Sequence, residues 1–126
     1  MQTANLYAAW IGIFLGIIVG VVIGLFFHNE GWMGGYSSWR RRMIRLGHVS
    51  FFGIALINFA YALSIAVFNV EIASSYSSYL FIAGAVTMPL ICFLCAYKKA
   101  FRHLFFIPVL CLVLGTLIFF TQGLMP

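Results

Sequence analysis

Residues 6–27 read LYAAWIGIFLGIIVGVVIGLFF, a stretch that contains no Lys, Arg, Asp or Glu. A bilayer core about 30 Å thick is crossed by roughly 20 apolar residues of α-helix, because each residue adds about 1.5 Å along the axis. This stretch therefore predicts one membrane-spanning helix. Further uncharged stretches cover residues 49–70, 79–97 and 104–126, and each is close to the same length.

Hydrophobic residues make up 64% of the 126 residues and charged residues only 7%, a balance that excludes a soluble domain of this length. We expect an all-α integral membrane protein whose residues 1–126 form a single domain, an up-down bundle of four transmembrane helices. The expected helices span about 6–27, 38–70, 79–97 and 101–122, the second one beginning at the membrane interface. Ser37 or Ser38 can cap the start of that second helix.

The basic residues indicate how the bundle is oriented. All seven lie in two connections, at Arg40, Arg41, Arg42, Arg45, Lys98, Lys99 and Arg102. Loops rich in Lys and Arg stay in the cytoplasm, so both termini and the connection 71–78 are expected on the other side. We expect a bacterial inner membrane, with helix 6–27 kept as an anchor because no signal-peptide pattern accompanies it. The net charge of +5 predicts anionic lipid headgroups as partners, and no nucleic acid, since the cations adjoin helix ends.

Four glycines recur at every fourth position of the first helix: Gly12, Gly16, Gly20 and Gly24. Gly costs roughly 1 kcal/mol relative to Ala inside a helix, so such a row needs a compensating contact. In lipid, small residues let two helix backbones approach closely, and that packing offsets the cost. The row predicts a helix-packing face, either against this chain's own helices or against another subunit.

Three polar side chains share one side of the second helix. Arg41, Arg45 and His48 stand at i, i+4 and i+7. Cations at a helix start face the positive end of the helix dipole, which disfavours them unless an anion is nearby. The sequence leaves three candidates for that anion: a lipid phosphate, an acidic surface of a partner protein, or the propionates of a haem.

A b-type haem in a helical bundle needs two imidazoles at similar depth on different helices. His48 begins the second span and His103 begins the fourth, so haem b between these two helices is one possibility. The arginines close enough in sequence to bind its propionates are Arg41, Arg45 and Arg102. Histidine is common at a headgroup boundary, and His28 lies at a third one, so the first expectation is that the chain holds no cofactor.

Cys92 and Cys95 have the spacing of a redox or metal motif. The pair resembles that of the vitamin K epoxide reductase family of four-helix membrane thiol oxidoreductases, but only over these four residues. The second, loop-borne cysteine pair that this family uses is absent. Because thiols inside an apolar helix are poorly reactive, we interpret the pair as buried structural cysteines.

Function is constrained mainly by what the spans lack. Ion-coupled transporters place carboxylates within the membrane, and the four spans have none; no nucleophile is paired with a base, and no zinc-ligand spacing occurs. The leading hypothesis is a small non-catalytic subunit of a larger membrane complex, such as a respiratory or other energy-transducing one. The alternatives are a b-type cytochrome subunit and a small channel or carrier lined by Asn58, Tyr61 and Ser64.

Overall fold

The computed structural model describes residues 2–71 and 75–125, with the side chain of residue 2 excepted. Its long helices are α1 (Gln2–Phe26), α2 (Trp39–Phe68) and α3 (Tyr76–Tyr97), followed by a composite span of η2 (Lys99–Phe105), α4 (Phe106–Phe119) and η3 (Phe120–Leu124). All four spans are long and apolar enough to cross a membrane. The predicted all-α bundle of four transmembrane helices is therefore confirmed, and the chain is an integral membrane protein.

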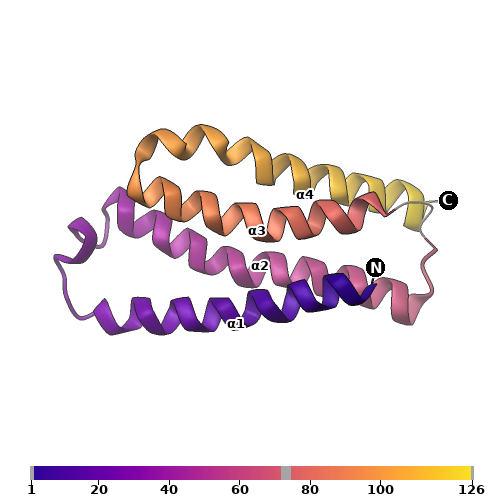
Figure 1. The fold of residues 1–126 in the computed structure, drawn as a ribbon, viewed down its shortest axis with the longest axis horizontal. Coiled ribbons are helices and arrows are strands. Elements are labelled where there is room, and N and C mark those ends of the chain that lie inside the picture. Colours follow the sequence, from indigo (N-terminus) through magenta and orange to yellow (C-terminus); the bar gives the residue numbers. More distant parts are fainter. Residues whose placement is uncertain (1, 72–74, 126) are drawn as a thin grey trace.

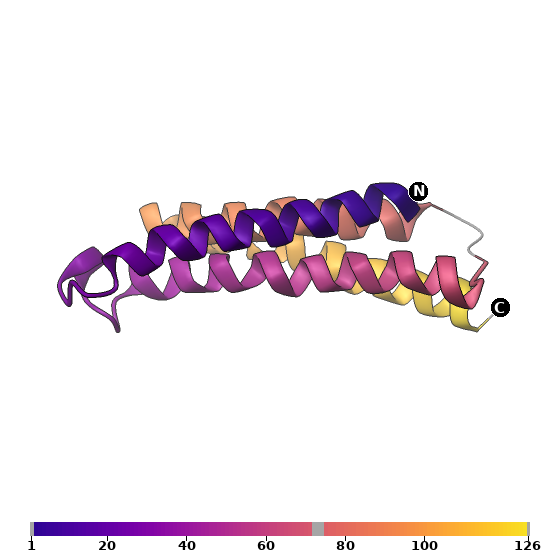
Figure 2. The ribbon, with the colours of Figure 1, turned by 90° about the horizontal axis from the view of Figure 1, so that it is seen from below.

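The helices run up and down in a staggered row (Figure 1). Each packs on its sequence neighbour, α1 on α2, α2 on α3 and α3 on α4, with a smaller contact between α1 and α3. Figure 2 shows α1 and α3 on one side of this row and α2 and α4 on the other. As a result, α1 and α4 are edge helices. The two chain ends lie at one end of the bundle, and the connections α1–α2 and α3–α4 lie at the opposite end.

Three helix limits differ from the sequence-based expectation, one of them that of α3, which begins at Tyr76 and not at residue 79, so that the expected connection 71–78 is shorter. Helix α1 begins at Gln2, about four residues early, because Asn5 is fully buried inside the bundle instead of belonging to an outer tail. The fourth span is not α-helical throughout: residues 99–105 form a tighter 3-10 segment and residues 120–124 a π turn. Pro108 lies in the first turn of α4, where its missing N–H is not needed. The expected outer connection 71–78 and the last residue fall partly outside the described residues.

The connection between α1 and α2, residues 27–38, contains the short helix η1 (Trp32–Gly34). Gly34 and Gly35 have φ values of 85° and 94°, a region that residues with a Cβ rarely enter. Ser38, one of the two predicted caps, accepts a hydrogen bond from the Arg41 N–H at 3.2 Å and donates one to the Met33 carbonyl at 2.7 Å. The start of α2 is thus fixed to the turn before it.

Candidate functional site

Both basic connections lie at the same end of the bundle (Figure 1). Trp39 joins them, because its indole N–H donates to the Cys95 carbonyl at 2.9 Å and its ring lies 5.1 Å from the Lys99 ammonium. We call this the basic end, and the end that holds the two termini the terminal end. The candidate site residues at the basic end have markedly different surroundings.

Arg41 is enclosed, with 3% of its surface exposed. Its guanidinium donates to main-chain carbonyls just beyond α1, at distances of 3.3 to 3.5 Å from the oxygens of Phe27, Asn29 and Glu30. It also lies 5.4 to 5.7 Å from the ring centroids of Phe27, Trp32 and Tyr36. The C-terminal end of α1 carries the negative end of its dipole, which compensates this cation. Arg41 therefore has internal partners at the end of α1, while its Nε is buried without a hydrogen-bond partner among the described residues.

Arg45 and His48 are half-buried on the same side of α2. The Arg45 guanidinium stacks 3.9 Å from the centroid of the Tyr36 ring, and the His48 ring meets Phe52 edge-on. One nitrogen of each, Nη1 of Arg45 and Nδ1 of His48, is buried without a hydrogen-bond partner among the described residues. Both side chains serve as packing groups here, pressed against the α1 side of the bundle.

The two histidines considered as haem ligands have different neighbours. His48 lies between α1 and α2, where a Cβ added to Gly20 would come within 2.7 Å of its Cε1. His103 and Arg102 are exposed on η2, which packs on α3 and α4. His48 is thus packed against α1, whereas His103 lies on a segment that packs on α3 and α4. The residues present do not suit a haem ligated by both histidines.

Three of the four glycines in the predicted row face α2. A Cβ on Gly12 would come within 3.1 Å of the Ala55 Cβ and 3.2 Å of the Phe51 carbonyl oxygen, and one on Gly16 within 2.8 Å of the Phe52 ring. A Cβ on Gly20 would likewise come too close to the His48 ring. Gly24 has no described atom within 4 Å of the position of a Cβ, so it takes no part in this contact.

A buried amide network joins three helices near the terminal end. Asn5 of α1 donates to the Asn58 side-chain oxygen at 2.8 Å and accepts a hydrogen bond from the Ser78 hydroxyl. The Asn58 amide donates in turn to the carbonyls of Ile54 and Phe81, at 3.0 and 3.2 Å. Asn5 and Asn58 are both 0% exposed. Through these hydrogen bonds, Asn58 holds α1, α2 and α3 together.

The other two residues of the suggested polar path are similarly occupied. The Tyr61 ring is buried between Phe81 and Phe119, with both centroids 5.4 Å away. The Ser64 hydroxyl donates to the Ala60 carbonyl of its own helix. Asn58 and Tyr61 are packed in the interior and Ser64 bonds to its own helix, an arrangement that does not favour the channel alternative.

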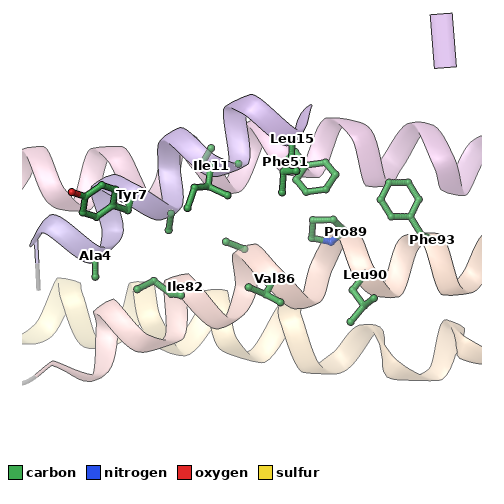
Figure 3. A pocket seen from close by; sticks show the side chains of 14 residues that line it. Ala4, Tyr7, Ile11, Leu15, Phe51, Ile82, Val86, Pro89, Leu90 and Phe93 are labelled. Atoms are coloured by element: carbon green, nitrogen blue, oxygen red, sulfur yellow. The ribbon is translucent and has the colours of Figure 1, made fainter. Parts of the chain in front are cut away.

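A groove opens between α1 and α3, with α2 as its floor (Figure 3). Its main section has a volume of about 730 Å³ and is walled by α1 and α3 side chains, with Phe51 and Ala55 of α2 beneath. The walls of the groove are formed by Ala4, Tyr7, Ala8, Ile11, Gly12 and Leu15 of α1 and by Ile82, Ala85, Val86, Pro89, Leu90 and Phe93 of α3. Every lining side chain is apolar or small except Tyr7. A separate cavity of about 370 Å³ lies at the basic end; it shares Phe93 with the groove and is also lined by Arg40 and Tyr97.

None of the known families, curated proteins and solved structures compared with this chain matches it. Its function is therefore argued from its own geometry.

The cysteines are packing residues in this structure. Cys92 and Cys95 are fully buried and free, on the side of α3 that faces the start of α2. A Cβ on Gly47 would come within 3.1 Å of the Cys92 Cβ, so the two helices are in close contact there. This agrees with the interpretation of the pair as buried structural residues.

Sequence reasoning missed Asn5, Ser78 and the groove. The expected helix 6–27 leaves Asn5 out, yet Asn5 continues the inward-facing stripe of Ala9, Gly12 and Gly16 by one further helical step. Extending that periodicity toward the N-terminus would have found it. The groove depends on how far α1 and α3 separate, which no local pattern encodes.

Proposed function

We propose that this chain is a small non-catalytic subunit of a larger membrane complex, such as an energy-transducing complex of a bacterial inner membrane. The observation that supports it is the open row of helices, in which α1 and α4 are edges. An edge helix presents most of its surface outward, and that surface is available to other helices of an assembly.

The edge helices are suited to such contacts. Exposed side chains of α4 include Val109, Leu110, Val113, Leu114 and Leu117. On α1, Gly24 lowers the stability of the helix, and no side-chain contact among the described residues compensates for this cost. A helix of a neighbouring subunit would supply the missing packing. The amides of Asn5 and Asn58, in contrast, are engaged in hydrogen bonds within this chain.

Site-specific photo-crosslinking tests the proposal. A photoreactive phenylalanine at Val21 of α1 or Leu114 of α4, both exposed, is expected to form adducts with another protein after irradiation of native membranes. The same probe at Leu56 of the central helix α2, also exposed, is the matched control and is expected to capture mainly lipid. Lipid adducts alone at both edge positions, with a 14.1 kDa monomer in mild detergent, would contradict the proposal.

The proposed orientation places the basic end in the cytoplasm, supported by the location of all basic connections at that end. Reporter fusions to the C-terminus check it: a periplasmic phosphatase is expected to be active there, and a reporter that folds only in the cytoplasm is expected to be silent. The opposite pair of results would invert the orientation.

A further inference from the structure

We infer that the side of α2 that carries Arg45 and His48 binds a phosphate group at the boundary of the membrane. This site goes beyond the proposed subunit role and does not depend on it. Three observations carry the inference: buried nitrogens without partners, unbonded nitrogens of the same side chains at the surface, and positive charge that no described carboxylate neutralises.

Three nitrogens on one side of α2 are buried without a hydrogen-bond partner among the described residues. They are Nε of Arg41, Nη1 of Arg45 and Nδ1 of His48, and the three residues recur at helical spacing. Arg41 is 3% exposed, and only its two terminal nitrogens reach carbonyls. A buried charged donor is costly to leave unpaired. This strip of nitrogens therefore calls for an acceptor that the described part of the chain does not supply.

The same side chains also present nitrogens at the surface. Nε and Nη2 of Arg45 and Nε2 of His48 are not buried, and they make no hydrogen bond to any described residue. Packing holds both side chains in place, Arg45 on the Tyr36 ring at 3.9 Å and His48 edge-on to Phe52. These contacts fix the guanidinium and the imidazole and leave their outer nitrogens available to a ligand.

No described carboxylate neutralises this region. All seven Lys and Arg lie at the basic end (Figure 1), and the chain has only two acidic residues, Glu30 and Glu71. Glu71 follows α2 at the terminal end, and Glu30 is exposed and forms no ion pair among the described residues. The guanidinium carbons of Arg41 and Arg45 both lie within 5.7 Å of the Tyr36 ring centroid. Like charges beside one ring repel each other, and a bound anion offsets that repulsion.

Donor number and depth select phosphate among the anions. The Arg45 guanidinium can form two parallel hydrogen bonds to a phosphate, and His48, one turn further along, can donate to a third oxygen. A carboxylate has only two oxygens, which the guanidinium would occupy. The uncharged stretch of α2 begins at Val49, so both side chains lie at the level of lipid headgroups. The phosphate group can belong to a lipid or to inorganic phosphate in the adjacent water.

Binding of phosphatidic acid to the purified full-length chain, delipidated in neutral detergent, tests the site. Native mass spectrometry is expected to show one phosphatidic acid per chain, while diacylglycerol, which has the same acyl chains but no phosphate, binds about tenfold more weakly. Arg45→Gln is expected to remove this difference. Arg102→Gln, which removes an exposed cation from η2 at the same end, is expected to leave it intact. Equal binding of the two lipids, or equal loss in the two variants, would overturn the inference.

Two further variants separate the site from charge alone. Arg45→Lys keeps the charge but loses the paired hydrogen bonds, and it is expected to lower the affinity for phosphatidic acid about fivefold, with Arg102→Lys as the unaffected control. His48→Phe keeps a ring against Phe52 and removes both nitrogens, and a similar loss is expected. His103→Phe, on the exposed side of η2, is its control. Unchanged affinity in both Arg45→Lys and His48→Phe would contradict the site.

Competition by inorganic phosphate identifies the source of the phosphate group. A lipid headgroup is the expected ligand, because the site lies at the membrane boundary, so inorganic phosphate should leave phosphatidic acid bound. Displacement by phosphate, but not by chloride at the same ionic strength, would assign inorganic phosphate to the same site. Displacement by chloride as well would show that general electrostatics holds the lipid, and would contradict the site.

Discussion

The terminal end and the basic end of the bundle are held together by different chemistry. At the terminal end, short uncharged side chains from α1, α2 and α3 bond directly to one another, centred on Asn5 and Asn58. At the basic end, one long cation, Arg41, reaches the backbone beyond α1, and Trp39 reaches the backbone of α3. Short side chains require the helices to be close, while long ones bridge a wider separation.

The groove begins beside the network of the terminal end, since Ala4 and Tyr7 of its α1 wall flank Asn5. Asn5 and Ser78 bring α1 and α3 together near the chain ends, and no comparable pair joins these two helices among the described residues of the basic half. The contacts of Arg41 hold the α1–α2 turn without closing that gap. A bundle can therefore be rigid at both ends and still keep an opening along its side.

The largest effect is expected from breaking the terminal end. Asn58→Leu removes the acceptor for Asn5 and the donor to Phe81, and we expect a loss of about 3 kcal/mol in the free energy of unfolding. Reversible denaturation of the detergent-solubilised protein measures it. Ser64→Ala, which alters a hydroxyl bonded only within its own helix, is the control and should cost less than about 0.5 kcal/mol. Equal losses would show that the network does not hold the helices.

At the basic end, Arg41→Met keeps an unbranched, though shorter, apolar stem but removes the charge and all three carbonyl contacts. We expect a loss of about 2 kcal/mol, because the end of α1 loses its cation. Proteolytic cleavage of the connection 27–38 should also become faster in this variant. Arg42→Met, at an exposed neighbouring position, serves for comparison; if it quickens cleavage equally, the role assigned to Arg41 is wrong.

The glycine row sharpens the comparison along α1. Gly12→Ala places a methyl group 3.1 Å from the Ala55 Cβ and 3.2 Å from a backbone oxygen, so α1 and α2 must separate. The expected cost is between about 1 and 2 kcal/mol. Gly24→Ala meets open space and is expected to be neutral or slightly stabilising, since Ala favours helix. Melting temperatures of the two variants check this, and a larger drop for Gly24→Ala would reverse the assignment.

The smallest effect is expected at the cap of α2. Ser38→Ala loses the hydrogen bonds to the Arg41 N–H and the Met33 carbonyl, which predicts a cost between about 0.5 and 1 kcal/mol. Ser37→Ala, at the exposed residue just before it, should leave the stability unchanged. Thermal unfolding followed by circular dichroism distinguishes them, and identical curves for both variants would mean that the cap contributes nothing.

The sequence predicted the spans well, because twenty uncharged residues have few alternatives to crossing a bilayer. It also located the packing face of α1, as far as the structure describes contacts at Gly12, Gly16 and Gly20. It could not predict the partner of Arg41, because the carbonyls that hold it come from a turn whose shape depends on Gly34 and Gly35. The same charge pattern suits a lipid phosphate and a helix end equally well.

The histidine pair shows a second limit. Similar depth in the membrane is readable from sequence, but the direction in which a ring points is set by its helix neighbours. His48 is turned toward Gly20 of α1, whereas His103 lies exposed on η2. Depth alone therefore cannot establish that two residues share a ligand.

The partners of Asn5 also set an order of events during synthesis. Asn58 follows it by 53 residues and Ser78 by 73. At an elongation rate of about 5 to 20 residues per second, roughly 4 to 15 s pass before Ser78 is made. Until Asn58 is made, the nascent α1 carries an amide with no native partner, and the Ser78 partner follows only with the third helix. The first helix made is thus among the last to be fixed, and its assembly waits for the third.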